Sequence, residues 1–259
     1  MEPVEIDARV VSQLCFSGAW AVESPILVLD RDTVRFANQV LLRMLGYGDA
    51  HELIGHAAAD VVRGLAGAAS SLSPGEGSQA QPPHSVSAKL LRKRGGSRQE
   101  TAYVAAIEVG SELLTLLFFC SAQGIESESR LPEKPDLGPG APELGRAIID
   151  ALPVPILIQD FGTILFANAA ARTYLQTPEG DRVEGQPIAA IVHPDGMDAM
   201  VERVQFVFDT QHTLRGVPVK VRTFDGRPFH TVADAYPIQS DGVLAALILA
   251  TSVSEGRPD

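Results

Sequence analysis

The residues best suited to chemistry in this sequence are two cysteines, six histidines and thirty-two carboxylates. Cys15 and Cys120 are too few and too far apart for a disulfide framework, and no Cys or His spacing typical of zinc occurs. The carboxylates are scattered, and the motifs GxSxG, GxxxxGK[ST] and HExxH are missing, as is GxGxxG after a strand. We therefore expect no metal site and no enzyme activity.

The charge of the chain limits its partners. A formal net charge of -11 argues against non-specific binding to nucleic acid or an anionic membrane, because both need a positive surface. The basic stretch LRKRGGSR, Leu91 to Arg98, is best explained as a solvated hairpin turn. No apolar run approaches a membrane span, and the acidic N-terminus lacks a signal-peptide core. We expect a cytoplasmic protein without nucleic-acid or membrane partners.

An internal repeat organises the chain. The stretch PILVLDRDTVRFAN, residues 25–38, returns as PILIQDFGTILFAN, residues 155–168, at an offset of 130. The same offset aligns further pairs, among them Gly55 with Gly185, Arg92 with Arg222, Leu114 with Leu244 and Leu117 with Leu247. A constant offset over so long a span predicts one fold used twice.

The repeat also predicts the segment boundaries. Residues 121–143 are rich in Pro, Gly and acidic residues and lack apolar periodicity, which is typical of an extended linker. We expect an amphipathic helix at 1–22, a first domain at 23–120 and a second domain at 144–255.

Each domain is expected to contain a helix, a β-hairpin, a group of helices and three antiparallel strands. The sequence Asp160-Phe161-Gly162 predicts the hairpin turn of the second copy. Asn38 and Asn168 precede short helices and are predicted N-caps, with a ligand contact as the alternative for Asn168. A longer helix after Asp195 should carry one apolar stripe. That stripe comprises Met197, Val201, Val204 and Phe208.

This ordered series resembles a PAS domain. In the second copy the resemblance rests on ILFANAAA, VEGQPIAAIVHPDG and VRTFDGRPFHTVADAYPI, and in the first copy, less fully, on VRFANQVLLRMLGY, ELIGHAAADVV and LRKRGGS. It implies an α+β fold with two PAS-like domains, each a five-stranded antiparallel sheet with helices on one face. The first domain should be degenerate, because Pro and Gly between Gly67 and His84 forbid the long helix. We expect its cavity to be open, collapsed or absent.

The resemblance implies a function in signal transduction. PAS domains are sensory and interaction modules, so the chain is expected to regulate a partner kinase or transcription regulator through dimerisation, with or without a small ligand. The alternative is a haem- or flavin-binding redox or gas sensor, and the cofactor stays unknown. Neither cysteine lies in the helix motif of flavin photochemistry, and His193 and His230 are weak candidates for haem ligands.

The resemblance also places a ligand pocket in the second domain, between the sheet and the helices. Apolar and aromatic walls with a few polar groups are typical of ligand sites, although the same residues can form an ordinary core. The candidates are Phe166, Asn168, Tyr174, Met197, Val201, Val204, Phe229 and Tyr236.

The N-terminal helix suggests how two chains associate. Its apolar face carries Val10, Val11, Leu14 and Trp20. A degenerate first domain cannot bury all of this face, so we expect a homodimer paired through the helix.

Overall fold

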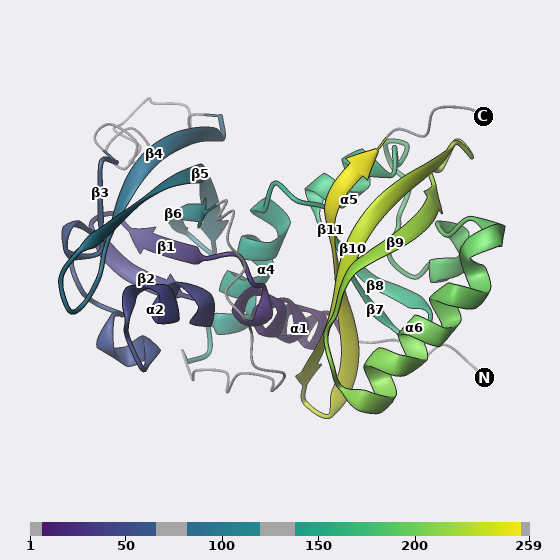
Figure 1. Cartoon of the computed structure of the whole chain (residues 1–259), viewed down its shortest axis with the longest axis horizontal. Helices are drawn as coiled ribbons and strands as arrows, with labels where there is room; N and C mark the ends of the chain where they lie inside the picture. The colour runs from purple at the N-terminus through teal and green to yellow at the C-terminus, as the bar shows by residue number, and fades with distance from the viewer. Residues whose placement is uncertain (1–6, 66–81, 120–137, 255–259) are drawn as a thin grey trace. The chain divides into compact units, whose positions relative to one another are not determined.

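The computed structural model describes residues 7–65, 82–119 and 138–254, whose contacts divide into two compact units. The unit of the second domain includes the chain up to Gly18 and from Pro139 onward, and the unit of the first domain begins at Ala19. Figure 1 shows the helices and strands of both units. Most of the predicted linker at 121–143 lies outside the described residues.

The first domain contains an antiparallel sheet in the order β2-β1-β6-β5-β4-β3. Its strands are β1 (Ile26–Asp30), β2 (Thr33–Ala37), β3 (Val62–Arg63), β4 (His84–Leu91), β5 (Ser97–Val109) and β6 (Glu112–Phe119). Its helices are α2 (Gln39–Leu45), η1 (Ala50–Glu52) and η2 (Ala58–Asp60). The short strand β3 adds a sixth strand to the predicted five, because Val62 pairs with Leu90. Most of the stretch in which we expected no long helix lies outside the described residues.

The second domain contains a five-stranded antiparallel sheet in the order β8-β7-β11-β10-β9. Its strands are β7 (Ile156–Asp160), β8 (Thr163–Ala167), β9 (Leu214–Arg222), β10 (Pro228–Ser240) and β11 (Val243–Ser254). Its helices are α4 (Ala141–Ala151), α5 (Ala169–Tyr174), η3 (Ile188–Ala190), η4 (Pro194–Gly196) and α6 (Met197–Thr210). Two antiparallel sheets with helices confirm the predicted α+β class. In the described ranges, no helix combines the length and apolar character that a membrane crossing requires.

Helix α1 (Ala8–Ala21) packs closely against the second domain along its first part. A Cβ atom added to Gly145 would overlap the backbone of Phe16, so α1 and α4 touch at backbone distance. The Ser17 hydroxyl donates to the carbonyl oxygen of Gln239 at 3.1 Å. A Cβ atom on Gly18 would meet the side chain of Leu247 in β11.

The apolar face of α1 is not free for a second chain. Leu14 is fully buried, Val11 and Trp20 are nearly so, and Val10 is half-buried within the single chain. The prediction that this face needs a partner chain to be buried is therefore wrong. The homodimer itself stays a prediction.

The sheet of the second domain has two different faces, because successive side chains of a strand point to opposite sides. Leu247 lies on the face that α1 approaches, and Ile248 lines the opposite face, toward α6. Phe166 belongs to the first of these faces, where the guanidinium carbon of Arg146 in α4 lies 5.2 Å from its ring centroid. Helices therefore cover both faces of this sheet: α6 covers one face, as expected, and α1 and α4 cover the other.

The repeat offset changes by one residue in the last strands. Leu27 pairs with Leu117 in the first domain, whereas Leu157 pairs with Ile248 in the second, which gives an offset of 131. The predicted match of Leu117 with Leu247 is therefore wrong, because Leu117 occupies the position of Ile248. A one-residue slip exchanges the two faces of a strand, so Leu117 corresponds to a residue on the α6 face.

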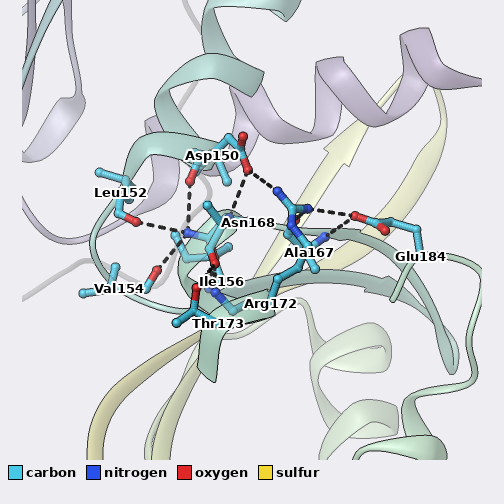
Figure 2. A network of polar contacts seen from close by, with 12 residues as sticks. Asp150, Leu152, Val154, Ile156, Ala167, Asn168, Arg172, Thr173 and Glu184 are labelled. Carbon is cyan, nitrogen blue, oxygen red and sulfur yellow. Dashed lines mark hydrogen bonds and ion pairs between the residues drawn. The ribbon is translucent and has the colours of Figure 1, made fainter. Parts of the chain in front are cut away.

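The two predicted N-caps are confirmed. Asn168 Oδ1 accepts a hydrogen bond from the Ala171 amide at 2.8 Å, and Asn38 Oδ1 accepts one from the Leu41 amide at 3.1 Å. Asn168 is also the centre of a larger network (Figure 2). It accepts from the Ile156 amide at 2.9 Å and donates to the carbonyl oxygens of Ile149, Leu152 and Val154 at 3.1, 3.3 and 2.9 Å. One side chain thereby joins the end of α4, strand β7 and helix α5.

Candidate functional site

A cavity of about 120 Å³ lies within the second domain, between the sheet and the helices. Its walls are almost entirely apolar. The sheet contributes Leu157, Gln159, Thr231, Ala235, Ala246 and Ile248, and the helices contribute Tyr174, Met200, Arg203, Val204 and Val207, among others. An apolar space with a few polar groups has the character of a small-molecule site.

Two of the eight candidate residues, Tyr174 and Val204, line the cavity. Met197 and Phe229 pack in the adjoining apolar cluster, and Phe229 meets Tyr174 edge-on with ring centroids 4.7 Å apart. Val201 does not contribute, because 45% of it is exposed.

Strand geometry and hydrogen bonding exclude the other three candidates from the wall. Phe166 lies under Arg146, and Tyr236 pairs with Leu247, so both belong to the sheet face turned away from α6. Asn168 does not line the cavity, because its amide is engaged by backbone groups on all sides. Among the strands, the candidates came from β8 and β10, whereas the cavity is lined by residues of β7, β9, β10 and β11.

Helix α6 turns a different stripe toward the cavity from the one predicted. Met200, Val204 and Val207 face inward, at positions i, i+4 and i+7. Val201 lies one residue from Met200, which is about 100° around the helix, and so points toward solvent. The periodicity correctly predicted the helix but placed its buried stripe partly wrong.

Small residues on the sheet create the space for the cavity. At three structurally matched positions the second domain has Ala where the first has a larger side chain. The pairs are Ala235 with Val104, Ala246 with Thr115, and Ala250 with Phe119. Phe119 is among the largest fully buried side chains described. The second domain therefore has smaller side chains than its own repeat at three positions of the cavity floor.

Gln159 is the most informative polar residue at the cavity, and we did not single it out from the sequence. It is fully buried in β7 and lines the cavity. Its Oε1 accepts a hydrogen bond from the Gly162 amide at 3.0 Å, whereas its Nε2 is buried and finds no partner among the described residues. A detectable signal was present in the sequence, because the repeat has Leu29 where the second copy has this Gln.

Two hydroxyl groups complete the interior polar surface. Tyr174 and Thr231 both line the cavity. Burial raises the pKa of the Tyr174 phenol, and the nearby Thr231 hydroxyl acts in the opposite direction. The phenol is consequently protonated and neutral at physiological pH, so it can donate as well as accept.

Arg203 is the charged residue of the wall. It is half-buried, and its guanidinium donates to the carbonyl oxygen of Pro218 at 2.8 Å in an exposed contact. This bond ties α6 to β9 at the edge of the cavity and directs the charge toward solvent.

The residues at the cavity do not fit a haem or a flavin. Neither His193 nor His230 lines it; His193 instead accepts from the Asp195 amide at 3.3 Å, and His230 is exposed. A cavity of about 120 Å³ is close to the engineered cavity of about 150 Å³ that holds a benzene molecule. Among the described residues, no group of His, Cys, Asp or Glu could hold a metal ion.

The predicted basic hairpin is joined by a further arginine. Arg43 of α2 lies with Arg92, Arg94 and Arg98 around one surface hollow of the first domain. Arg92 and Arg94 are exposed, and Arg98 forms an ion pair with Glu100.

Comparison with known proteins gives the same family for both domains. Residues 143–250 match the PAS fold, and residues 21–73 match a PAS domain family. Among curated protein sequences, the search finds no match.

Solved structures similar to this chain include three PAS domains. One is from an HTR-like protein of Haloarcula marismortui, at 19% identity and a TM-score of 0.36, covering 44% of this chain and 97% of that one. Another is from nitrogen regulation protein NR(II) of Vibrio parahaemolyticus, at 21% identity and a TM-score of 0.35, covering 42% and 97%. The third is from a two-component sensor histidine kinase, at 9% identity and a TM-score of 0.36, covering 44% and 97%.

Proposed function

Since the chain carries two PAS-family domains in tandem, at residues 21–73 and 143–250, we propose that it regulates a partner kinase or transcription regulator as a sensory module. PAS domains are typical of sensors in signal transduction. The observation that carries the proposal is the cavity of the second domain, whose floor has smaller side chains than the matched positions of the chain's own repeat. We further propose that the module is cytoplasmic, works as a homodimer and catalyses no reaction of its own.

The contacts around the cavity support a role in relaying a signal. Gln159 lines the cavity and also holds the amide of Gly162 in the β7–β8 turn. The neighbouring Phe161 is 73% exposed and stacks on Phe208 of α6 with ring centroids 4.0 Å apart. A ligand that moves Gln159 can therefore change the position of the exposed Phe161 ring through the β7–β8 hairpin.

The same domain connects its cavity to helix α4. Arg172 of α5 donates to Asp150 of α4 at 3.0 Å, and Asn168 donates to the carbonyl oxygen of Ile149 (Figure 2). Helix α5 also supplies Tyr174 to the cavity wall. A ligand that favours one arrangement of these elements would shift their populations, with a coupling of typically 1–3 kcal/mol.

The proposal is tested by identifying and reconstituting the partner. Proximity labelling in the native cell, with wild-type chain and a Phe161→Ser variant, should enrich a kinase or transcription regulator more strongly with the wild type. The purified partner should then change its phosphorylation or DNA-binding activity about fivefold or more when the full chain is added. An enriched partner whose activity does not respond to the chain would overturn the proposal.

A further inference from the structure

We propose that the cavity of the second domain binds a small neutral carbonyl compound, whose oxygen accepts a hydrogen bond from Nε2 of Gln159. The ligand would be apolar apart from this oxygen and have about six to nine non-hydrogen atoms. This inference rests on the proposed sensory function, and names the chemical class that its cavity recognises.

The orientation of the Gln159 amide follows from its hydrogen bonding. The Gly162 amide can only donate, and it lies 3.0 Å from one end of the Gln159 side chain, so that end must be the oxygen. The other end is therefore the NH2 group, which is buried and has no partner among the described residues. Buried polar groups are almost always hydrogen-bonded, so the NH2 group of Gln159 needs an acceptor that a bound ligand can supply.

The internal repeat shows that a Gln at this position is not needed for the fold. In the first domain, the matched strand β1 has Leu29, which is fully buried and pairs with Thr115. Gln159 pairs with Ala246, the smaller residue that helps to open the cavity. The second domain thus has a buried donor and additional space at neighbouring positions of the same sheet.

The walls select a ligand without charge. They are apolar apart from Gln159, the neutral hydroxyls of Tyr174 and Thr231, and Arg203, which donates to Pro218 at an exposed edge. An ionised ligand would lose its hydration without gaining an opposite charge inside the cavity. A carbonyl oxygen needs one or two donors, which Gln159 and Tyr174 can supply.

The test compares two probes of nearly equal shape, acetophenone and α-methylstyrene. The second has a methylene group in place of the carbonyl oxygen of the first. Dissociation constants are measured by NMR titration of the full chain, for the wild type and for Gln159→Met. The wild-type preference for acetophenone should fall about tenfold in the variant, as expected for loss of one hydrogen bond to a buried donor. In the wild type, acetophenone should also shift the side-chain amide resonances of Gln159, a result that needs no variant.

A cavity-filling control uses the chain's own repeat. Ala250→Phe copies Phe119 of the first domain and should abolish binding of both probes; retained binding would place the probes elsewhere and overturn the inference. An unchanged preference in Gln159→Met, or tighter binding of benzoate than of acetophenone, would also overturn it. If neither probe binds the wild type, the ligand class is wrong, while the partner experiment decides the sensory function separately.

Discussion

At the residue scale, one asparagine in each domain joins the segments around the first hairpin by hydrogen bonds. Asn168 makes five hydrogen bonds while fully buried, and Asn38 connects the matching groups of the first domain. We expect Asn168→Ala to lower the free energy of unfolding by about 3 kcal/mol, more than an N-cap alone, because several buried backbone groups lose their partner. The measurement is denaturant unfolding of the full chain followed by circular dichroism.

The matched variant Asn38→Ala serves as the control for this prediction. Trp20 is the single tryptophan of the chain, and its ring meets Phe36 edge-on in the first domain. Asn38→Ala should therefore lower the unfolding midpoint reported by tryptophan fluorescence. A loss below about 1 kcal/mol for Asn168→Ala would show that the N-cap bond alone matters.

The residues that could be predicted from sequence were those with a local geometric rule. An Asn before a helix has one common role, and both predicted caps are present. Gln159 could not be assigned a role in this way, because its importance depends on the Gly162 amide and on the space beside Ala246. The sequence does show Gln159 where the repeat has Leu29, but this identifies only a polar residue in an otherwise apolar strand.

At the element scale, the close packing of α1 on α4 depends on a glycine. Ala is normally the better helix former by about 1 kcal/mol, yet a Cβ atom on Gly145 would overlap the backbone of Phe16. We expect Gly145→Ala to separate α1 from α4 and expose Cys15, whose pKa burial raises to about 12. In a Cys120→Ser background, alkylation of Cys15 at pH 8 should accelerate by roughly 100-fold, because a solvated thiol ionises far more readily.

Gly18→Ala is the matched control for the helix contact. Its added Cβ would meet only the end of the Leu247 side chain, which can rotate away. Alkylation should stay within about threefold of the background rate, since the buried thiol keeps its raised pKa. In the background protein, the rate should keep increasing as pH rises above 9, because the thiolate of Cys15 is still scarce there. Equal rates for the two glycine variants would contradict the proposed packing.

The elements themselves were predicted better than their faces. The β7–β8 hairpin and α6 follow from the Asp160 to Gly162 turn and from helical periodicity. The faces depend on register, and a shift of the repeat offset from 130 to 131 exchanges the sides of the last strands. Tyr236 lies on the face turned away from α6, and this placement follows from its pairing with Leu247.

At the scale of the whole molecule, we expect a homodimer whose contacts lie outside α1. The apolar face of α1 is already buried, whereas the large apolar side chains exposed in the described residues are Phe161, Val201 and Phe206. Symmetric pairing would remove such side chains from water. Light scattering at about 50 micromolar should give twice the mass of one chain for the wild type and one mass for a Phe161→Ser, Phe206→Ser double variant. Val10→Ser, on the half-buried edge of α1, should remain dimeric. A monomeric wild type, or a monomeric Val10→Ser beside a dimeric double variant, would contradict this arrangement.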